Sequence, residues 1–487
     1  MKKPILLLCL FGISLNLLFA QPEGKPIQIG QSFSMDSEIM SEERPYLVYL
    51  PEIYEEDGEP VAVLYLMDGD GHFHHTTGMV DFLMRQGRIP PMMVVGIPNT
   101  PNNRTRDLTP PIEKDQKAKE QFKDAGQADR TLSFLREELI PHIDKAYNTN
   151  SYRTLVGHSF GGIFVVQALL TQSDVYDSFL SISPSMWWDD QNLVTKAKAF
   201  LDKKPDLDGF FYMTMGNEGG DMLGGAQKLA ELLAKKAPKS FGSEFKLMEE
   251  ETHGSVPHRS TYYGLEAIFA PWFRADLEAL FADGGIAAID AHFEKMQHKL
   301  GFKTEISEND LNQLGYALMA KENMSGALEV FETNIKRFPK SFNVYDSMGE
   351  ALKKKGDTKE SIKFYQKSLD LNPGNEGAIK MLAEMDVIVD PLANAPKLSE
   401  KQLAEYTGTY EIDLGGEVKI ELKEGVLHLT AQNGPPPQTL VVAKKDQLIS
   451  RPLNFTLQFE RDEQGKVSHF DVQLGPGQKG KATLKSK

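Results

Sequence analysis

The chain has 487 residues, 40% of them hydrophobic, and a formal net charge of −15 at pH 7. This length exceeds what one hydrophobic core supports, so we expect several domains. The acidic balance, which no basic run offsets, disfavours nucleic acid and anionic membrane surfaces as partners.

The first twenty residues have the pattern of a secretory signal. Lys2 and Lys3 precede an apolar run over residues 5–19 that ends at small residues. We predict a cleaved signal peptide over 1–20. The alternative, a membrane anchor, is disfavoured because the run is short and polar sequence follows. The one cysteine, Cys9, lies in this segment. The mature protein is therefore expected in the periplasm or secreted, without disulfides, thiolate metal sites or stable membrane insertion.

From about residue 27 to residue 282, strand-like and helix-like segments alternate. This alternation predicts a mostly parallel sheet covered by helices, within an α/β domain over 21–282. The expected strands are 45–50, 61–67, 93–97, 154–156, 179–182, 210–215 and 244–248. The expected helices are 128–146, 160–170, 223–236 and 261–269.

Residues 283–390 are predicted to be helical and contain an internal repeat. Leu311, Gly315, Ala327, Phe331 and Pro339 have counterparts 34 residues later in Tyr345, Gly349, Ser361, Tyr365 and Pro373. This period and its small, aromatic and proline positions are typical of tetratricopeptide repeats. We expect paired antiparallel helices, capped by helices at 286–300 and 376–386, that contribute nothing to the chemistry.

Residues 391–487 are predicted to be a linker followed by a β-rich domain. Short alternating segments such as "EVKIELKEGVLHLTAQ" and "NFTLQFERDEQGKVSHFDVQ" are separated by glycine-containing turns. This pattern predicts a small antiparallel sheet or barrel.

A serine lies at a glycine-flanked corner in "LVGHSFGG". Gly157 and Gly161 stand two places either side of Ser159, between a short apolar strand and an apolar helix. A nucleophile on a strained strand-to-helix turn requires small neighbours at these positions. The alternative is a plain glycine-rich turn. We predict that Ser159 is a nucleophile.

A serine nucleophile needs a general base that an acid orients. In proteins whose nucleophile occupies such a strand-to-helix turn, the serine comes first in the chain, the acid second and the histidine last. His253 follows the last expected strand, whereas His258 precedes an expected helix and is the alternative. Glu218 is the first acid after the strand at 210–215, and Asp221 is its alternative. We predict Glu218 and His253.

Backbone N–H groups are expected to stabilise an oxyanion. Phe160, directly after the serine, supplies the first, and Asp70 in the glycine-rich loop "LYLMDGDGHFHH" is predicted to supply the second. His72 in this loop, Trp187 and Trp188 are expected to line the substrate pocket. Neither the histidines nor the aspartates of the loop have the spacing of a metal site, so we expect no metal and no cofactor.

An ion pair is expected near the end of the strand at 93–97. Arg104, Arg106 and Asp107 follow it closely. A structural pairing is favoured over substrate binding at these residues.

Residues from about 44 to 273 resemble the esterase family of α/β-hydrolases, which includes enterochelin-type siderophore esterases, esterase D-like enzymes and feruloyl or acetyl-xylan esterases. The matching segments are "RPYLVYLP", "VLYLMDGDGHF", "VVGIPNTPNNRTRDLTP", "LVGHSFGG", "SISPSMWW", "MTMGNEGG" and "ETHGSVPHRS". The resemblance implies an α/β-hydrolase fold, Ser159 as nucleophile and His253 as base. It supports Glu218 less directly, because members differ in the acid. Residues 400–487 resemble small β-rich domains appended to some secreted serine hydrolases.

The expected function is therefore exported serine carboxylic-ester hydrolysis through an acyl-enzyme, on siderophore or carbohydrate esters. One alternative is an acyltransferase that uses the same triad. Another is a non-catalytic protein that binds partners through its repeats. The expected partners are a small-molecule ester and a protein bound by the tetratricopeptide region.

Overall fold

In the computed structural model, the chain divides into two compact units, Met1–Phe269 and Ala270–Lys487. The residues that the structure describes are 27–203, 205–393, 395–413, 416–431, 436–450, 455–475 and 478–487. The predicted signal peptide, 1–20, lies outside them. Within those ranges, no helix combines the length and the apolar composition that crossing a bilayer requires.

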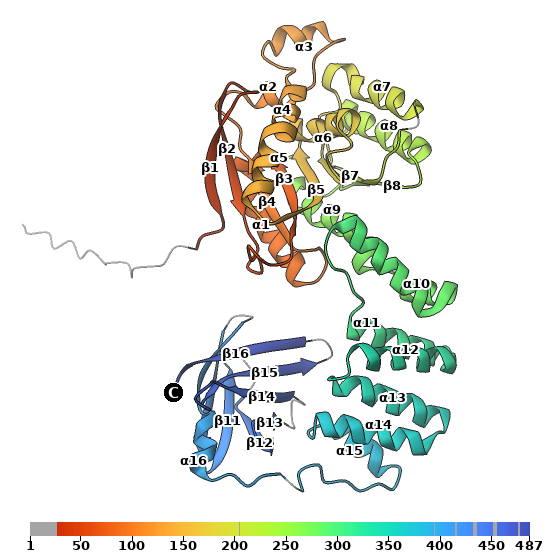
Figure 1. Ribbon diagram of the computed structural model, residues 1–487. Coiled ribbons are helices and arrows are strands. Elements are labelled where there is room, and N and C mark those ends of the chain that lie inside the picture. Colours follow the sequence, from red (N-terminus) through yellow and green to blue (C-terminus); the bar gives the residue numbers. More distant parts are fainter. Residues whose placement is uncertain are drawn as a thin grey trace, which may run out of the picture. The chain divides into compact units, whose positions relative to one another are not determined.

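An eight-stranded sheet forms the centre of the first unit, in the order β1-β2-β4-β3-β5-β6-β7-β8 (Figure 1). Its strands are β1 (Gln31–Ser37), β2 (Glu42–Tyr49), β3 (Val61–Met67), β4 (Met92–Ile97), β5 (Thr149–His158), β6 (Ser178–Ile182), β7 (Gly209–Met215) and β8 (Phe241–Leu247). The pairs β1–β2 and β2–β4 are antiparallel. The other neighbours are parallel. The predicted α/β-hydrolase fold is confirmed, with β1 as an edge strand that the prediction lacks.

The helices of this unit connect and cover the strands. They are α1 (Gly69–Arg85), α2 (Arg104–Leu108), α3 (Gln116–Gln121), α4 (Ala128–Phe134), the π-helical turn η1 (Leu135–Leu139), α5 (Ile140–Ala146), α6 (Phe160–Thr171), α7 (Trp188–Asp202), α8 (Gly220–Lys236) and α9 (Val256–Phe273). Helix α9 begins in the first unit and extends past its boundary. Helix α6 is apolar around most of its circumference, as expected for a helix in the core.

The prediction of a glycine-rich loop after β3 was wrong. Residues from Gly69 onward form helix α1, which buries Met79, Val80 and Leu83. The helix begins with Gly-Asp-Gly-His, residues that are poor or average helix formers. Packing of its later turns against the sheet outweighs this weak local preference.

The parallel strands bring five chain segments to one edge of the sheet. In parallel strands the carboxyl ends point the same way. Asp68 follows β3, Ser159 follows β5, Ser183 follows β6, and Glu218 lies shortly after β7. His253 lies beyond β8 in the same way. The topology thus gathers polar residues that are far apart in the sequence.

The second unit begins with paired helices. They are α10 (Leu277–Leu300), α11 (Glu308–Ala320), α12 (Met324–Arg337), α13 (Phe342–Lys355), α14 (Thr358–Leu371) and α15 (Glu376–Ala383). A Cβ on Gly315 would lie 2.5 Å from the Phe331 ring, and one on Gly349 would lie 3.1 Å from the Tyr365 ring. The same glycine–aromatic contact therefore closes both helix pairs, as the 34-residue repeat predicts.

The unit ends in a closed barrel of eight antiparallel strands, which confirms the predicted small β domain (Figure 1). A short helix, α16 (Glu400–Leu403), and the 3₁₀ turn η2 (Ala404–Tyr406) precede it. The strands are β9 (Gly408–Ile412), β10 (Glu417–Lys423), β11 (Val426–Ala431), β12 (Gln438–Lys444), β13 (Gln447–Ser450), β14 (Phe455–Arg461), β15 (Val467–Gly475) and β16 (Gln478–Ser486). In β14, buried Phe455, Leu457 and Phe459 alternate with outward-facing residues.

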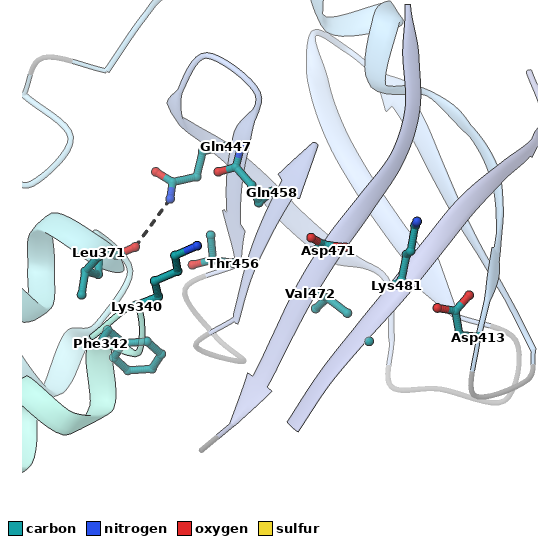
Figure 2. Close-up of a pocket in the computed structure, with 11 residues that line it drawn as sticks. Lys340, Phe342, Leu371, Asp413, Gln447, Thr456, Gln458, Asp471, Val472 and Lys481 are labelled. Carbon is teal, nitrogen blue, oxygen red and sulfur yellow. Dashed lines mark hydrogen bonds between the residues drawn. The ribbon is translucent and has the colours of Figure 1, made fainter. Parts of the chain in front are cut away.

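A cleft of about 670 Å³ lies between the repeats and the outer face of the barrel (Figure 2). Three hydrogen bonds join its two sides, and in one of them Thr456 Oγ1 donates to Asn372 Oδ1 at 3.1 Å. Its lining residues are Lys340, Phe342, Leu371, Asp413, Gln447, Thr456, Gln458, Asp471, Val472, Gly480 and Lys481. All of them belong to the second unit, whereas the predicted catalytic residues belong to the first.

Candidate active site

Ser159 occupies a strained turn between β5 and α6. Its backbone has φ 62° and ψ −113°, a conformation that non-glycine residues rarely adopt and that costs about 1–3 kcal/mol. A Cβ on Gly157 would lie 2.2 Å from the carbonyl oxygen of Gly161, and one on Gly162 would lie 2.8 Å from Pro184 Cα. Only glycine fits these two close approaches. At Gly161, the other predicted small neighbour of Ser159, a Cβ would lie 3.2 Å from Asp68 Oδ2, which is a tight contact.

The three predicted catalytic side chains form a continuous hydrogen-bonded chain. His253 Nε2 lies 3.0 Å from Ser159 Oγ. His253 Nδ1 lies 2.8 Å from Glu218 Oε1. Because the Glu218 carboxylate only accepts, Nδ1 donates to it and Nε2 is left to accept from the Ser159 hydroxyl. This is the arrangement in which a histidine can take the serine proton.

The loops that carry the acid and the base are tied to each other. The Asn217 N–H donates to the Glu251 carbonyl at 2.7 Å. Glu218 is nearly buried, with 9% of its side chain exposed, and its Oε2 has no hydrogen-bond partner among the described residues. The alternative acid, Asp221, lies in the first turn of α8 and accepts instead from Gln191 Nε2 at 3.2 Å.

Four further histidines extend in a row from the ring of His253. The His158 ring lies 4.5 Å from it, between centroids, and the His72 ring lies 5.4 Å from that of His158. Nδ1 of His72 then lies 3.0 Å from Nε2 of His75. The centroid of the His75 ring is 5.6 Å from that of the His258 ring. His258, the alternative base, is thus exposed at the far end of the row.

Burial keeps the inner members of the row uncharged. Desolvation, reinforced by the neighbouring His253 and His72, lowers the pKa of His158 to about 3. Desolvation and the nearby His72 lower the pKa of His75 to about 4. Burial also lowers the pKa of His72, against the effect of Asp68. The predicted pocket residue His72 therefore presents a neutral imidazole that faces His158.

The two predicted oxyanion donors, Phe160 and Asp70, both lie at helix N-termini. Phe160 is the first residue of α6, and Asp70 lies in the first turn of α1. N–H groups in a first turn have no intrahelical acceptor and carry the positive end of the helix dipole. The Asp70 carboxylate accepts from the Asn99 backbone N–H at 3.2 Å.

Asp68 is a site residue that sequence reasoning missed. It has a left-handed backbone at φ 54° and accepts from Arg104 Nε at 2.6 Å and Nη2 at 2.8 Å. The same guanidinium donates to the His158 carbonyl at 3.3 Å and lies 5.4 Å from the centre of the Phe160 ring. Arg104, which forms an ion pair with Asp68, therefore contacts both neighbours of Ser159 in the chain, His158 and Phe160. In the sequence, the only signal for this role was that Asp68, the first aspartate of "MDGDG", directly follows the strand at 61–67.

Arg106 and Asp107 form a separate, largely buried network. Arg106 Nε donates to Asp107 at 2.6 Å, and Arg44 Nη1 donates to the same carboxylate at 2.6 Å. Hydrogen bonds from Arg106 and Arg44 lower the pKa of Glu42 to about 2. This network joins β2 to α2, which is a structural role.

The adjacent tryptophans have different surroundings. Trp188 is 1% exposed, and its indole N–H donates to the Pro110 carbonyl at 3.0 Å. It is a core residue, because its one polar group is satisfied and its ring is enclosed, so the expectation that it lines the pocket does not fit the structure. Trp187 is half-buried and lies 6.1 Å from the Phe160 ring, next to the nucleophile.

The described side chains include no group of three or more His, Cys, Asp or Glu residues arranged to hold a metal ion. His72 and His75 contact each other as a pair, whereas His74 is exposed.

Comparison with known proteins matches the part of the chain that holds this site. The family described as "Putative esterase" matches residues 37–255. Ferri-bacillibactin esterase BesA of Bacillus subtilis is 30% identical over 216 residues, which cover 40% of this chain and 74% of that protein. The chain belongs to this esterase family. The predictions of the family and of a serine esterase are confirmed.

Other proteins are also similar to the esterase. A siderophore enterobactin esterase of Emericella nidulans is 31% identical over 163 residues, which cover 30% of the esterase chain and 52% of that protein. The crystal structure of an IroE-like serine hydrolase from Shewanella oneidensis has 28% sequence identity and a TM-score of 0.50. That comparison covers 63% of the esterase chain and 99% of the solved chain.

The second unit of the esterase matches two other families. A tetratricopeptide repeat matches residues 342–375, the second of the two predicted repeats. The family described as "Domain of unknown function (DUF3471)" matches residues 392–484, which include the barrel. The esterase match and these two matches do not overlap.

We expect Glu218→Gln to lower kcat of the esterase by about 10³–10⁴-fold. A glutamine amide can donate to Nδ1, which would move the proton of His253 to Nε2 and leave no acceptor for the serine proton. Steady-state kinetics with an aryl ester would measure the loss.

Asp221→Asn is the matched control and should change kcat by less than about threefold, because Asp221 does not contact His253. A large loss with Asp221→Asn and none with Glu218→Gln would move the acid to Asp221.

Proposed function

We propose that this esterase is an exported serine carboxylic-ester hydrolase that acts on siderophore esters through a Ser159–His253–Glu218 triad. The observation that carries the proposal is the hydrogen-bonded chain, 3.0 Å from Ser159 Oγ to His253 Nε2 and 2.8 Å from Nδ1 to Glu218. A weak hydroxyl nucleophile requires such a base and such an orienting acid.

In the acylation step, Ser159 Oγ attacks the ester carbonyl as its proton passes to His253 Nε2. The C–O bond to the alcohol then breaks, and the alcohol takes that proton from the imidazolium. Glu218 stabilises the imidazolium through its hydrogen bond to Nδ1. Water repeats the sequence on the acyl-enzyme and releases the acid.

The negative charge that forms on the carbonyl oxygen requires donors. We assign them to the N–H groups of Phe160 and Asp70, which lie in the first turns of α6 and α1. Donors held by rigid helices need no reorganisation as the charge develops. The half-buried Trp187 beside Phe160 is the pocket residue on the acyl or alcohol side.

The substrate class rests on the relatives. The Bacillus protein is named a ferri-bacillibactin esterase and the Emericella protein a siderophore enterobactin esterase. We therefore favour siderophore esters over carbohydrate esters as the substrate, because neither of these two relatives is named as an enzyme that acts on carbohydrate esters.

Two alternatives use the same chain differently. An acyltransferase would pass the acyl group from Ser159 to an alcohol other than water. A protein that binds partners through the helices over 277–383 would show no turnover, although such binding is compatible with hydrolysis in the first unit. Export is proposed from the signal pattern of residues 1–20.

A substrate panel tests the proposal. The purified protein would be assayed with aryl esters of increasing chain length, a feruloyl ester, an acetylated sugar and a catecholate siderophore ester. We expect the highest kcat/KM for the siderophore ester, with its free acid as the product. Preference for the acetylated sugar would contradict the substrate class. Transfer to added alcohols in preference to water would favour the acyltransferase.

A further inference from the structure

We infer that Ser185 is a further catalytic residue, whose hydroxyl donates a hydrogen bond to Ser159 Oγ and stabilises charge on that oxygen during both half-reactions. This inference rests on the proposed function of Ser159 as nucleophile. Ser185 Oγ lies 3.2 Å from Ser159 Oγ. Ser185 belongs to the "SPS" segment that follows β6.

The backbone holds the two serines in register. The Ser159 N–H donates to the Ile182 carbonyl at 3.0 Å, and the Ser185 N–H donates to the Ser159 carbonyl at 3.1 Å. Pro184, which directly precedes Ser185, packs against Gly162 in the space that a side chain at residue 162 would occupy. The segment after β6 is therefore fastened to the nucleophile turn, and the contact between the hydroxyls follows from main-chain geometry.

Counting protons decides which hydroxyl donates. Glu218 accepts from His253 Nδ1, so His253 Nε2 accepts from Ser159. The only hydroxyl proton of Ser159 is then committed to His253. The proton in the contact between the serines must come from Ser185, which is 3% exposed and has no other hydrogen-bond partner for its hydroxyl among the described residues.

This assignment leaves one direction at Ser159 Oγ free. The oxygen has four tetrahedral directions, taken by Cβ, by the proton that faces His253 and by the lone pair that accepts from Ser185. The remaining lone pair is the one that attacks the carbonyl. Ser185 thus helps to fix the direction of attack, which matters because attack requires aligned orbitals.

The contact should strengthen as charge develops. At 3.2 Å it is longer than the roughly 2.7–2.8 Å usual for two hydroxyls, so it is weak in the resting enzyme. Hydrogen bonds shorten and strengthen when the acceptor is charged. Ser159 Oγ gains negative charge as it loses its proton in acylation, and again as the C–Oγ bond breaks in deacylation. An interaction that is stronger in the transition state than in the ground state accelerates both steps.

The proton of Ser185 is not transferred at any step. In acylation the Ser159 proton goes to His253 and then to the alcohol. In deacylation the water proton goes to His253 and then to Ser159 Oγ. Ser185 only donates a hydrogen bond, so it differs from His253, which takes up a proton and gives it back in each half-reaction.

Pre-steady-state kinetics with 4-nitrophenyl acetate test the inference. In Ser185→Ala we expect the acylation and deacylation rate constants each to fall by about 10- to 100-fold, the loss typical of a hydrogen bond to a charged group. The Kd of the substrate should stay unchanged, because the interaction acts on the transition state. Ser178→Ala is the matched control. Ser178 is a buried serine of β6 that bonds to Thr154, and its loss should leave both rate constants within about twofold.

Ser185→Cys separates hydrogen bonding from packing, and it also serves if Ser185→Ala does not fold. Cysteine fills nearly the same space, but its thiol is a weak donor. We expect Ser185→Cys to fold, and we expect its acylation and deacylation rate constants to fall as they do in Ser185→Ala. Wild-type rate constants in Ser185→Cys would show that only packing matters and would overturn the inference. So would wild-type rate constants in Ser185→Ala, or an equal loss in Ser178→Ala.

Ser159→Ala, measured in parallel, distinguishes this failure from failure of the proposed function. If Ser159→Ala is inactive and Ser185→Ala retains wild-type rate constants, only the role of Ser185 is refuted. If Ser159→Ala retains turnover, the nucleophile itself is misassigned.

Discussion

Replacing Ser159 with alanine should lower kcat for ester hydrolysis by about 10⁶-fold, to the residual rate that binding and the oxyanion donors provide. No acyl-enzyme can form without Oγ, and His253 then has no hydroxyl to deprotonate. Steady-state kinetics with an aryl ester and with a catecholate siderophore ester would measure the loss. Mass spectrometry should also show no covalent adduct when the variant is treated with a fluorophosphonate that labels the wild type.

The fold of the Ser159→Ala variant should be unchanged, because both residues have a Cβ and the strained backbone persists. Thermal unfolding monitored by circular dichroism provides the control. A folded variant with undiminished turnover would exclude Ser159 as the nucleophile, and with it the whole triad.

We expect His253→Ala to lower kcat by about 10⁴-fold or more, and His258→Ala to stay within about tenfold of wild type. His253 lies 3.0 Å from the nucleophile and is oriented by Glu218. His258 lies at the start of α9, and its ring lies beside that of His75. The two variants remove the same side chain from positions five residues apart, so each is the control for the other.

The melting temperature should change little in either histidine variant, since both side chains are partly or fully exposed. The reverse ranking of the two variants would reassign the base to His258.

Local patterns in the sequence were sufficient for much of this protein. The strand at 61–67 was predicted with its observed bounds, because a seven-residue apolar run that contains Val61, Val63 and Tyr65 is shorter than most helices and favours a buried strand. The repeat at 34 residues predicted the helix pairs, because Gly315 and Phe331 meet within one pair, and Gly349 and Tyr365 meet within the next. Ser159 was predicted from its glycine neighbours, and the tightest of their contacts is local, because a Cβ on Gly157 would lie 2.2 Å from the carbonyl oxygen of Gly161.

Other features depend on contacts between distant segments, and local patterns gave little sign of them. The N-terminal turn of α1 has the composition of a loop, and its helix forms because Met79, Val80 and Leu83 are buried. Trp187 and Trp188 are adjacent in sequence, but only Trp188 is enclosed in the core, where the Pro110 carbonyl satisfies its indole N–H. The bond between Asp68 and Arg104 joins the end of β3 to the start of α2. The contact between Ser159 and Ser185 joins the segments that follow β5 and β6.

The sequence by itself determined the fold class, the repeats and the family, and it predicted Ser159 as the nucleophile, because each depends on spacing along the chain or on contacts with near neighbours. Only the tertiary structure decided which acid and which histidine meet the serine, since Glu218 and His253 reach it through the order of strands in the sheet. Glu218 and Asp221 differ by three residues in sequence, yet one faces His253 and the other bonds to Gln191. The physical reason is that parallel strands bring together loops that lie 35 to 94 residues apart in the chain, and such contacts leave no periodic trace in the sequence.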